Sequence, residues 1–262
     1  MRHLNIAADG LELSAIRRRR ELVPWLAFRF FHIRVLYNWA WDPDSFDWGP
    51  GTTQYRIRES GRLVSPLVGG YRLIAPRDSL SETMTYALPF FRDMVPDPSV
   101  WPLLAENHDL VMEVSRFALA FHRVGDRAFL RTVVRNVLRG ILWEQAKLRR
   151  PLCLAVVNPF LLSRYRKLGL ATKVIGFRKL RAASIFEKKL FGAEVPHYVV
   201  LINAALSEKW SLDGQLSSDL SPDFVFEGMH DYAQPFHRMG DDLNRRVQTL
   251  WDAVKEDPAA SS

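Results

Sequence analysis

Cysteine is nearly absent from this sequence. Its 262 residues include a single cysteine, Cys153, inside the apolar stretch LCLAVV. A lone cysteine cannot form an internal disulfide, and small apolar strands often bury one thiol. We therefore expect Cys153 to be a core residue. Because nothing in the cysteine content indicates an oxidising compartment, we expect a cytoplasmic protein.

Long uncharged apolar runs are absent as well. The most apolar segment, Trp25 to Trp41, is interrupted by Arg29, His32 and Arg34. A membrane-spanning helix needs about 20 mostly uncharged residues, so we expect no stable membrane insertion and interpret the run as a helix that lines a site. The stretch before it ends in RRRR and is polar and mixed, unlike a secretory signal.

The sequence also has no motif for a metal, a hydrolase or a nucleic acid. Its seven histidines are scattered, and none stands with Cys, Asp or another His at metal-ligand spacing. We find no nucleophile elbow, zinc finger, RNA-recognition motif or helix-turn-helix pattern. We therefore expect no metal, no cofactor and no nucleic-acid partner. The net charge of +7 and the pI of about 9.7 nevertheless favour some acidic partner.

The predicted elements alternate between helix and strand. We expect strands at 53–59, 67–75, 111–121, 151–160 and 197–206, and helices within 11–39, 82–95, 126–150 and 161–169. This order predicts an α/β (α+β) domain around a partly antiparallel sheet. We assign residues 1–215 to that domain. Residues 216–262 form a predicted C-terminal extension with one helix, roughly 236–255, and a disordered end.

Charged residues inside apolar segments are the most informative feature. The strand VMEVSRFALAF carries Glu113 and Arg116, although burying one unpaired charge costs on the order of several kcal/mol. Four further charged residues stand mostly near aromatic side chains: Arg29, Asp44, Asp47 and Arg72. The three arginines and three acids predict one buried network. Unrelated surface pairs, or a structural salt bridge across the sheet, are the alternatives.

The order of these residues resembles the LuxI-type autoinducer synthase family, the acyl-homoserine-lactone synthases. The family pattern begins with Arg, an aromatic residue and Trp, and Arg29, Ile33 and Trp39 stand at those positions. Its acidic pair, with an aromatic residue before the second Asp, resembles DSFD at 44–47, and Tyr55 follows in a strand. The departures here are Ile33 in place of an aromatic residue and a short loop before DSFD.

Two strand motifs complete the resemblance, which covers about residues 25–205. The family's Gly-x-x-Arg-Leu strand resembles GGYRLIA, with Arg72, and its Glu-x-Ser-Arg-Phe strand resembles EVSRFAL. After RLI the family has Pro-Thr, whereas this chain has Ala75-Pro76-Arg77. By this resemblance Glu113 and Arg116 are catalytic. The implied substrate-binding residues are Arg29, Ile33, Trp39, Asp44, Asp47, Arg72, Ser115 and Phe117.

The resemblance also implies a fold and a reaction. The fold is a GNAT-like three-layer sandwich with a mixed, splayed central sheet and a V-shaped cleft. The reaction transfers an acyl chain from an acyl carrier protein or coenzyme A to the amine of S-adenosylmethionine, and lactone closure releases methylthioadenosine. Acylation of another amine without lactone formation, and a non-catalytic acyl-carrier-binding protein, are the alternatives.

Two basic features of the sequence are relevant to the molecules that the protein binds. RKLGLA (166–171) matches an R-x-x-G-x-A pyrophosphate loop, but a glycine-terminated helix explains it better, because such a loop directly follows a strand like 111–121. We expect an acidic carrier protein to dock on the cations of this region, although a solvated face would look the same. They are Lys147, Arg149, Arg150, Arg164, Arg166 and Lys167.

Overall fold

The computed structural model describes nine ranges of the chain: 5–8, 10–37, 44–60, 66–123, 126–167, 169–181, 188, 192–206 and 240–258. The chain divides into two compact units. The first unit consists of Met1–Leu73, Ser115–Ile141 and Arg181–Val195, and the second of Ile74–Val114, Leu142–Leu180 and Pro196–Ser262. The predicted boundary at residue 215 lies outside the described residues.

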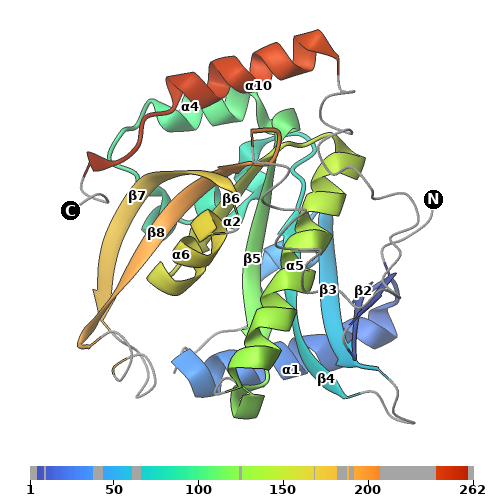
Figure 1. Ribbon diagram of the computed structural model, residues 1–262. Helices are drawn as coiled ribbons and strands as arrows, with labels where there is room; N and C mark the ends of the chain where they lie inside the picture. Colours follow the sequence, from blue (N-terminus) through green and yellow to red (C-terminus); the bar gives the residue numbers. More distant parts are fainter. Residues whose placement is uncertain are drawn as a thin grey trace. The chain divides into compact units, whose positions relative to one another are not determined.

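The first unit contains strands in the order β1-β2-β3-β4-β5 (Figure 1). Their bounds are Asn5–Ala8, Leu11–Ala15, Thr52–Glu59, Leu67–Ile74 and Val111–Leu119. Strand β2 pairs antiparallel with β1 and β3. The prediction of helix from residue 11 is therefore wrong for 11–15. LELSA alternates apolar and polar residues and buries Leu11 and Leu13, which is the pattern of a half-buried strand.

Helix α1, Arg19–Tyr37, packs against β3 and β4 in this unit (Figure 1). The contact explains the second glycine of GGYRL, Gly70. A Cβ atom at Gly70 would lie 2.1 Å from the Tyr55 carbonyl oxygen and 2.6 Å from the Trp25 ring. The bare backbone of Gly70 thus lets Trp25, which is fully buried, lie directly on the sheet.

Strand β5 belongs to both units and changes character along its length. Residues Val111–Val114 pair in parallel with Leu152–Ala155. Two residues beyond this pairing, Arg116 has a φ of 55°, which is the left-handed region that residues with a Cβ rarely adopt. Strand β5 is therefore irregular at Arg116.

The second unit contains strands in the order β5-β6-β8-β7. Strands β6, β7 and β8 span Leu152–Val157, Ala171–Arg181 and Glu194–Asn203. The β6–β8 pairing is antiparallel whereas the β5–β6 pairing is parallel, so the sheet is mixed, as predicted. Strand β7 is absent from our sequence prediction, which assigned no element there.

Helices join these strands. Helix α5 spans Arg127–Leu148 and α6 spans Pro159–Lys167, close to prediction. The single helix predicted at 82–95 is instead broken into η2 (Leu80–Glu82), α2 (Met84–Ala87) and α3 (Pro89–Arg92). Proline has no amide hydrogen to continue a helix, and Pro89 is the first residue of α3. Further short helices among the described residues are α4 (Val100–Glu106), η3 (His108–Leu110) and η4 (Phe121–Arg123).

Helix α10, Asp241–Ala253, belongs to the core of the second unit. It lies beside α4, and its Leu250 and Trp251 pack in the same cluster as Leu104 (Figure 1). The helix predicted at 236–255 is thus present. The prediction of disorder after it is wrong for Asp257, which is buried and whose amide donates to the Val174 carbonyl oxygen at 2.7 Å.

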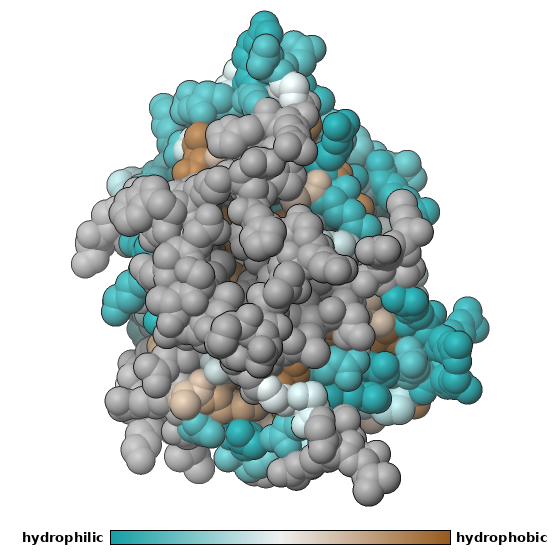
Figure 2. Space-filling view, turned by 45° about the vertical axis from the view of Figure 1, so that its right-hand side comes forward, coloured by the Kyte–Doolittle hydropathy of each residue, from teal (hydrophilic) through white to brown (hydrophobic). Residues whose placement is uncertain are grey.

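The described part of the surface in Figure 2 is mainly hydrophilic, with small separate hydrophobic areas. Exposed apolar side chains occur in both units and include Val23, Phe31, Trp48, Phe90 and Phe160. Among the described residues, no helix combines the length and apolar character needed to span a membrane.

Candidate active site

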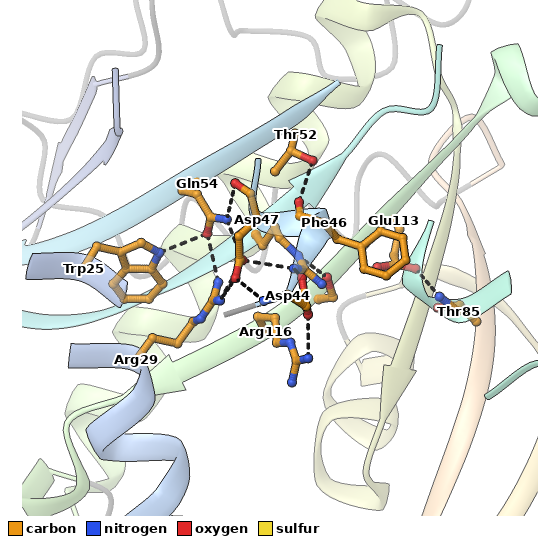
Figure 3. Close-up of polar contacts among 12 residues, drawn as sticks. Trp25, Arg29, Asp44, Phe46, Asp47, Thr52, Gln54, Thr85, Glu113 and Arg116 are labelled. Carbon is orange, nitrogen blue, oxygen red and sulfur yellow. Dashed lines mark hydrogen bonds and ion pairs between the residues drawn. The ribbon is translucent and has the colours of Figure 1, made fainter. Parts of the chain in front are cut away.

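Arg29 and Asp47 form a buried ion pair in the first unit (Figure 3). Arg29 of α1 is fully buried, and its Nη2 donates to both Asp47 carboxylate oxygens at 2.6 Å. Asp47 is the last residue of η1, Ser45–Asp47, and also accepts the Asp44 amide at 3.1 Å. Burial lowers the pKa of the Arg29 guanidinium to about 10 against the opposing effect of Asp47, so Arg29 stays charged at neutral pH.

Gln54 connects this pair to the sheet, and our sequence prediction missed it. Its Oε1 accepts hydrogen bonds from Trp25 Nε1 at 3.0 Å and from Arg29 Nη1 at 3.1 Å, while its Nε2 donates to Asp47 Oδ1 at 3.0 Å. The signal available in the sequence was an amide side chain, Gln54, beside the aromatic Tyr55 in the strand segment TTQYR. Gln54 thereby orients both members of the ion pair from β3.

Arg72 and Arg116 extend the network through Asp44. Arg72 Nη1 donates to Asp44 Oδ1 at 2.5 Å and to Asp47 Oδ1 at 3.0 Å, and its Nε donates to Ser115 Oγ at 3.1 Å. Arg116 Nη2 donates to Asp44 Oδ2 at 2.7 Å. Burial raises the pKa of the Asp44 carboxyl, but Arg72 and Arg116 lower it more, so the net pKa lies below its ordinary value.

Six of the predicted site residues therefore meet in one network within the first unit: Arg29, Asp44, Asp47, Arg72, Ser115 and Arg116. They come from α1, from the segment that leads to β3, from β4 and from β5. Ion pairs at this depth lose solvation on both partners, and removing one partner would strand a buried charge. The network therefore fixes the positions of these four segments relative to one another.

Glu113 has different surroundings from those we predicted. It lies in the second unit, is fully buried, and its Oε2 accepts the Thr85 amide at 2.7 Å. Its Oε1 has no hydrogen-bond partner, and the same holds for Thr85 Oγ1. No described arginine pairs with Glu113, so the third acid is not part of the arginine network. The expected set of three acids is wrong in this respect.

The other predicted residues lie around these groups or outside the description. Phe117 follows Arg116 on β5 and is half-buried. Ile33 lies in α1, but its side chain is outside the described part, as is the whole of Trp39. Cys153 is buried as predicted, and burial, followed by the nearby Glu113 charge, raises the pKa of its thiol.

The predicted basic residues differ in their structural surroundings. RKLGLA ends a helix: Gly169 has a φ of 75°, and the Leu170 amide donates to the Tyr165 carbonyl oxygen at 3.1 Å. The glycine-terminated helix is confirmed. Arg150 is half-buried, and its guanidinium already donates to the carbonyl oxygens of His108, Val111 and Pro76 at 2.6–2.7 Å. Its part in docking a carrier protein stays a prediction. Arg149, Arg166 and Lys167 are exposed.

Metal binding has no support within the described ranges. No group of three His, Cys, Asp or Glu side chains is placed there to hold an ion. The absence of a metal and of a cofactor remains a prediction.

The elements and their pairing define an α/β protein with a mixed central sheet, and solved structures share that fold. No protein-family model and no curated protein matches the sequence. The crystal structure of the acyl-homoserine lactone synthase LasI matches with a TM-score of 0.53 and 14% identity, over 85% of this chain and 100% of LasI. The suspected LuxI-type resemblance is therefore confirmed at the level of the fold.

Two further solved structures match with lower TM-scores. The CoA-dependent acyl-homoserine lactone synthase BjaI, solved with MTA, has a TM-score of 0.47 and 16% identity over 79% of this chain and 90% of BjaI. FeeM, an N-acyl amino acid synthase from uncultured soil microbes, has a TM-score of 0.48 and 13% identity over 74% of this chain and 90% of FeeM.

Proposed function

We propose that this protein is an acyl-homoserine-lactone synthase, a cytoplasmic enzyme that makes a quorum-sensing signal. Its substrates are S-adenosylmethionine and an acyl thioester. The observation that carries the proposal is the network of six family-pattern residues, which span positions 29 to 116 and yet share direct hydrogen bonds. The LasI-like fold supports the same conclusion.

Glu113 is the proposed general base. An ammonium must lose a proton before its nitrogen can attack a thioester carbonyl, and a positioned carboxylate, acting directly or through water, accelerates such a step. One Glu113 oxygen accepts the Thr85 amide, and the other has no protein hydrogen bond, so it can accept that proton. The new C–N bond then forms, the thioester C–S bond breaks, and the thiolate leaves and takes up a proton.

Lactone closure follows in the same molecule. The methionyl carboxylate oxygen attacks the γ-carbon of its own side chain, and the C–S bond to the sulfonium breaks. Methylthioadenosine leaves as a neutral sulfide, so this step needs no further proton transfer. Acidic and aromatic side chains suit a sulfonium and a purine, and Asp44, Phe46 and Phe117 are the proposed contributors. Asp47 is not one of them, because its side chain is fully buried and both of its carboxylate oxygens accept hydrogen bonds from Arg29.

The arginine network is proposed to hold the substrate-binding segments rather than to act on the reacting atoms. Asp44 joins β4 to β5 through Arg72 and Arg116. Each charged hydrogen bond of this kind contributes about 1.5–3 kcal/mol. The acyl donor is an acyl carrier protein or coenzyme A, and a carrier would meet the exposed cations Arg149, Arg166 and Lys167.

A second candidate is an N-acyltransferase that acylates another amine without closing a lactone. The segment Ala75-Pro76-Arg77, which departs from the family pattern, is firmly held here. The Pro76 carbonyl oxygen accepts Arg150 Nη2 at 2.7 Å, and the Arg77 amide donates to Glu82 Oε2 at 2.5 Å. Both bonds use backbone atoms and so fix the path of the departing segment, which is the proposed basis for a different acceptor.

Mass spectrometry tests both candidates. Purified protein is incubated with S-adenosylmethionine and acyl thioesters on carrier protein or coenzyme A, and an organic extract of expressing cells is analysed in parallel. Equal yields of acyl-homoserine lactone and methylthioadenosine are expected. An N-acylated product without methylthioadenosine would favour the second candidate. Unchanged thioester with every acceptor would leave only the non-catalytic, carrier-binding alternative.

A further inference from the structure

One side of α1 presents apolar side chains to solvent. Val23 is 67% exposed and Phe31 is 52% exposed, and Pro24 and Ala27 between them are also exposed. At 3.6 residues per turn these four positions fall on one helix face, within an arc of about 100°. The opposite face buries Trp25 and Arg29 in the first unit. Helix α1 is therefore apolar on two faces, although only one of them is covered by the sheet.

Four exposed arginines, Arg17–Arg20, adjoin this apolar stripe. Arg20 precedes Val23 by three residues and Ala27 by seven, so it lies on the same face. The nearby acid, Glu21, already accepts Arg56 Nη2 at 3.3 Å and the Arg17 amide at 3.4 Å. The cluster is therefore strongly positive, and its charge is complementary to an anionic surface.

We propose that this face of α1, made of Arg17–Arg20, Val23, Pro24, Ala27 and Phe31, docks on an anionic membrane surface. A convex helix with protruding apolar side chains suits the lipid interface, where such groups enter the acyl boundary. Arginine has a long apolar stem, so its guanidinium reaches lipid phosphate while the stem covers apolar surface. Docking of this kind needs no spanning helix, and none is present among the described residues.

Vesicle co-sedimentation of the full chain tests the proposal. Vesicles of phosphatidylcholine alone are compared with vesicles that also contain phosphatidylglycerol. We expect binding only to the anionic vesicles and release at high salt. The double variant Arg19→Gln/Arg20→Gln should weaken binding by about fivefold per arginine. The double variant Val23→Gln/Phe31→Gln should weaken binding at low salt, because it removes the apolar contribution, and should leave the salt dependence of the remaining binding unchanged.

A matched control is available on α6 in the second unit. Phe160 is 54% exposed, and Arg166 and Lys167 are exposed cations. The triple variant Phe160→Gln/Arg166→Gln/Lys167→Gln should bind anionic vesicles like the unmodified protein. Circular dichroism and denaturant unfolding of each variant establish that it is folded.

Four results would overturn the membrane assignment. They are failure of the unmodified protein to bind anionic vesicles, an equal loss in the α6 variant, docking to an acidic carrier protein without vesicle binding, and self-association that the α1 variants abolish. The third result would assign the face to a protein partner, and the fourth to a second copy of this chain. The experiment does not depend on catalysis, so its failure leaves the proposed function untouched.

Discussion

Glu113 and Arg116 lie three residues apart on β5 and have different surroundings. Glu113 is fully buried, with one oxygen on the Thr85 amide and the other without a hydrogen bond. Arg116 reaches Asp44 at 2.7 Å from a backbone with a φ of 55°. A buried carboxylate with spare acceptor capacity suits proton transfer, whereas a strained arginine in a salt bridge suits positioning.

Glu113→Gln is therefore expected to remove activity with little loss of stability. Glutamine keeps an oxygen for the Thr85 amide but is not a base, so kcat should fall by about 10²–10⁴. Steady-state kinetics and thermal unfolding measure the two effects. Glu144→Gln on α5 is the matched control, since Glu144 is also buried. If Glu113→Gln lowers the melting temperature while activity per folded molecule persists, Glu113 is structural.

Arg116→Ala and Arg116→Gly separate the salt bridge from the backbone strain. Both remove the bond to Asp44, which keeps its bond to Arg72 at 2.5 Å, so each should lose about 1–3 kcal/mol of stability. Glycine adopts a positive φ freely, so the glycine variant should be about 1 kcal/mol more stable than the alanine variant. Denaturant unfolding gives both values. An alanine variant as stable as the glycine variant would contradict the strain at this position.

Helices α5 and α6 end in the same way but with different residues. After α5, the Arg149 amide donates to the Ala146 carbonyl oxygen at 3.2 Å and the Arg150 amide to Gln145 at 2.9 Å. After α6, the Gly169 and Leu170 amides make the equivalent bonds. Arg149 and Gly169 have φ values of 56° and 75°. Both ends are Schellman motifs, which place a left-handed residue just past the helix.

This pair predicts opposite effects of substitution. Arg149→Gly should stabilise the protein by about 1 kcal/mol, because glycine relieves the left-handed strain. Gly169→Ala should destabilise it by a similar amount for the converse reason. Equilibrium unfolding in urea measures both variants against the unmodified protein. A loss of stability in Arg149→Gly would mean that its side chain makes a compensating contact.

The free energy of unfolding of the protein should depend on pH through His32. Burial, followed by the proximity of His122, lowers the pKa of His32 from 6.5 to about 4. The unfolded chain then binds more protons than the folded chain between those values, so stability is full above about pH 6.5 and falls as pH drops toward 4. The loss amounts to about 3 kcal/mol at most.

His32→Phe tests this dependence, because phenylalanine preserves the ring contact with Phe28, whose centroid lies 4.0 Å away. Urea unfolding is measured at several pH values for both proteins. The slope of stability against pH should be smaller in the variant throughout the window. Parallel slopes would assign the acid sensitivity to other groups.

The amino-acid sequence by itself determined the features that depend on short stretches of chain. Helix α5, the Gly169 stop and the buried Cys153 follow from periodicity, end signals and local apolarity. The ordered motifs also identified the arginines and the acidic pair, because a buried charge inside an apolar segment needs a partner. These inferences required no knowledge of which segments become neighbours.

Only the tertiary structure decided which partner each polar group takes. Gln54 joins Trp25 to the ion pair, and Glu113 bonds to the Thr85 amide instead of an arginine. Asp257 is a further example. It is buried, and its amide donates to the Val174 carbonyl oxygen of β7, although the sequence predicted disorder there. Hydrogen bonds act over about 3 Å, so their partners depend on strand register and helix docking, which bring distant residues together. No short stretch of sequence contains that information.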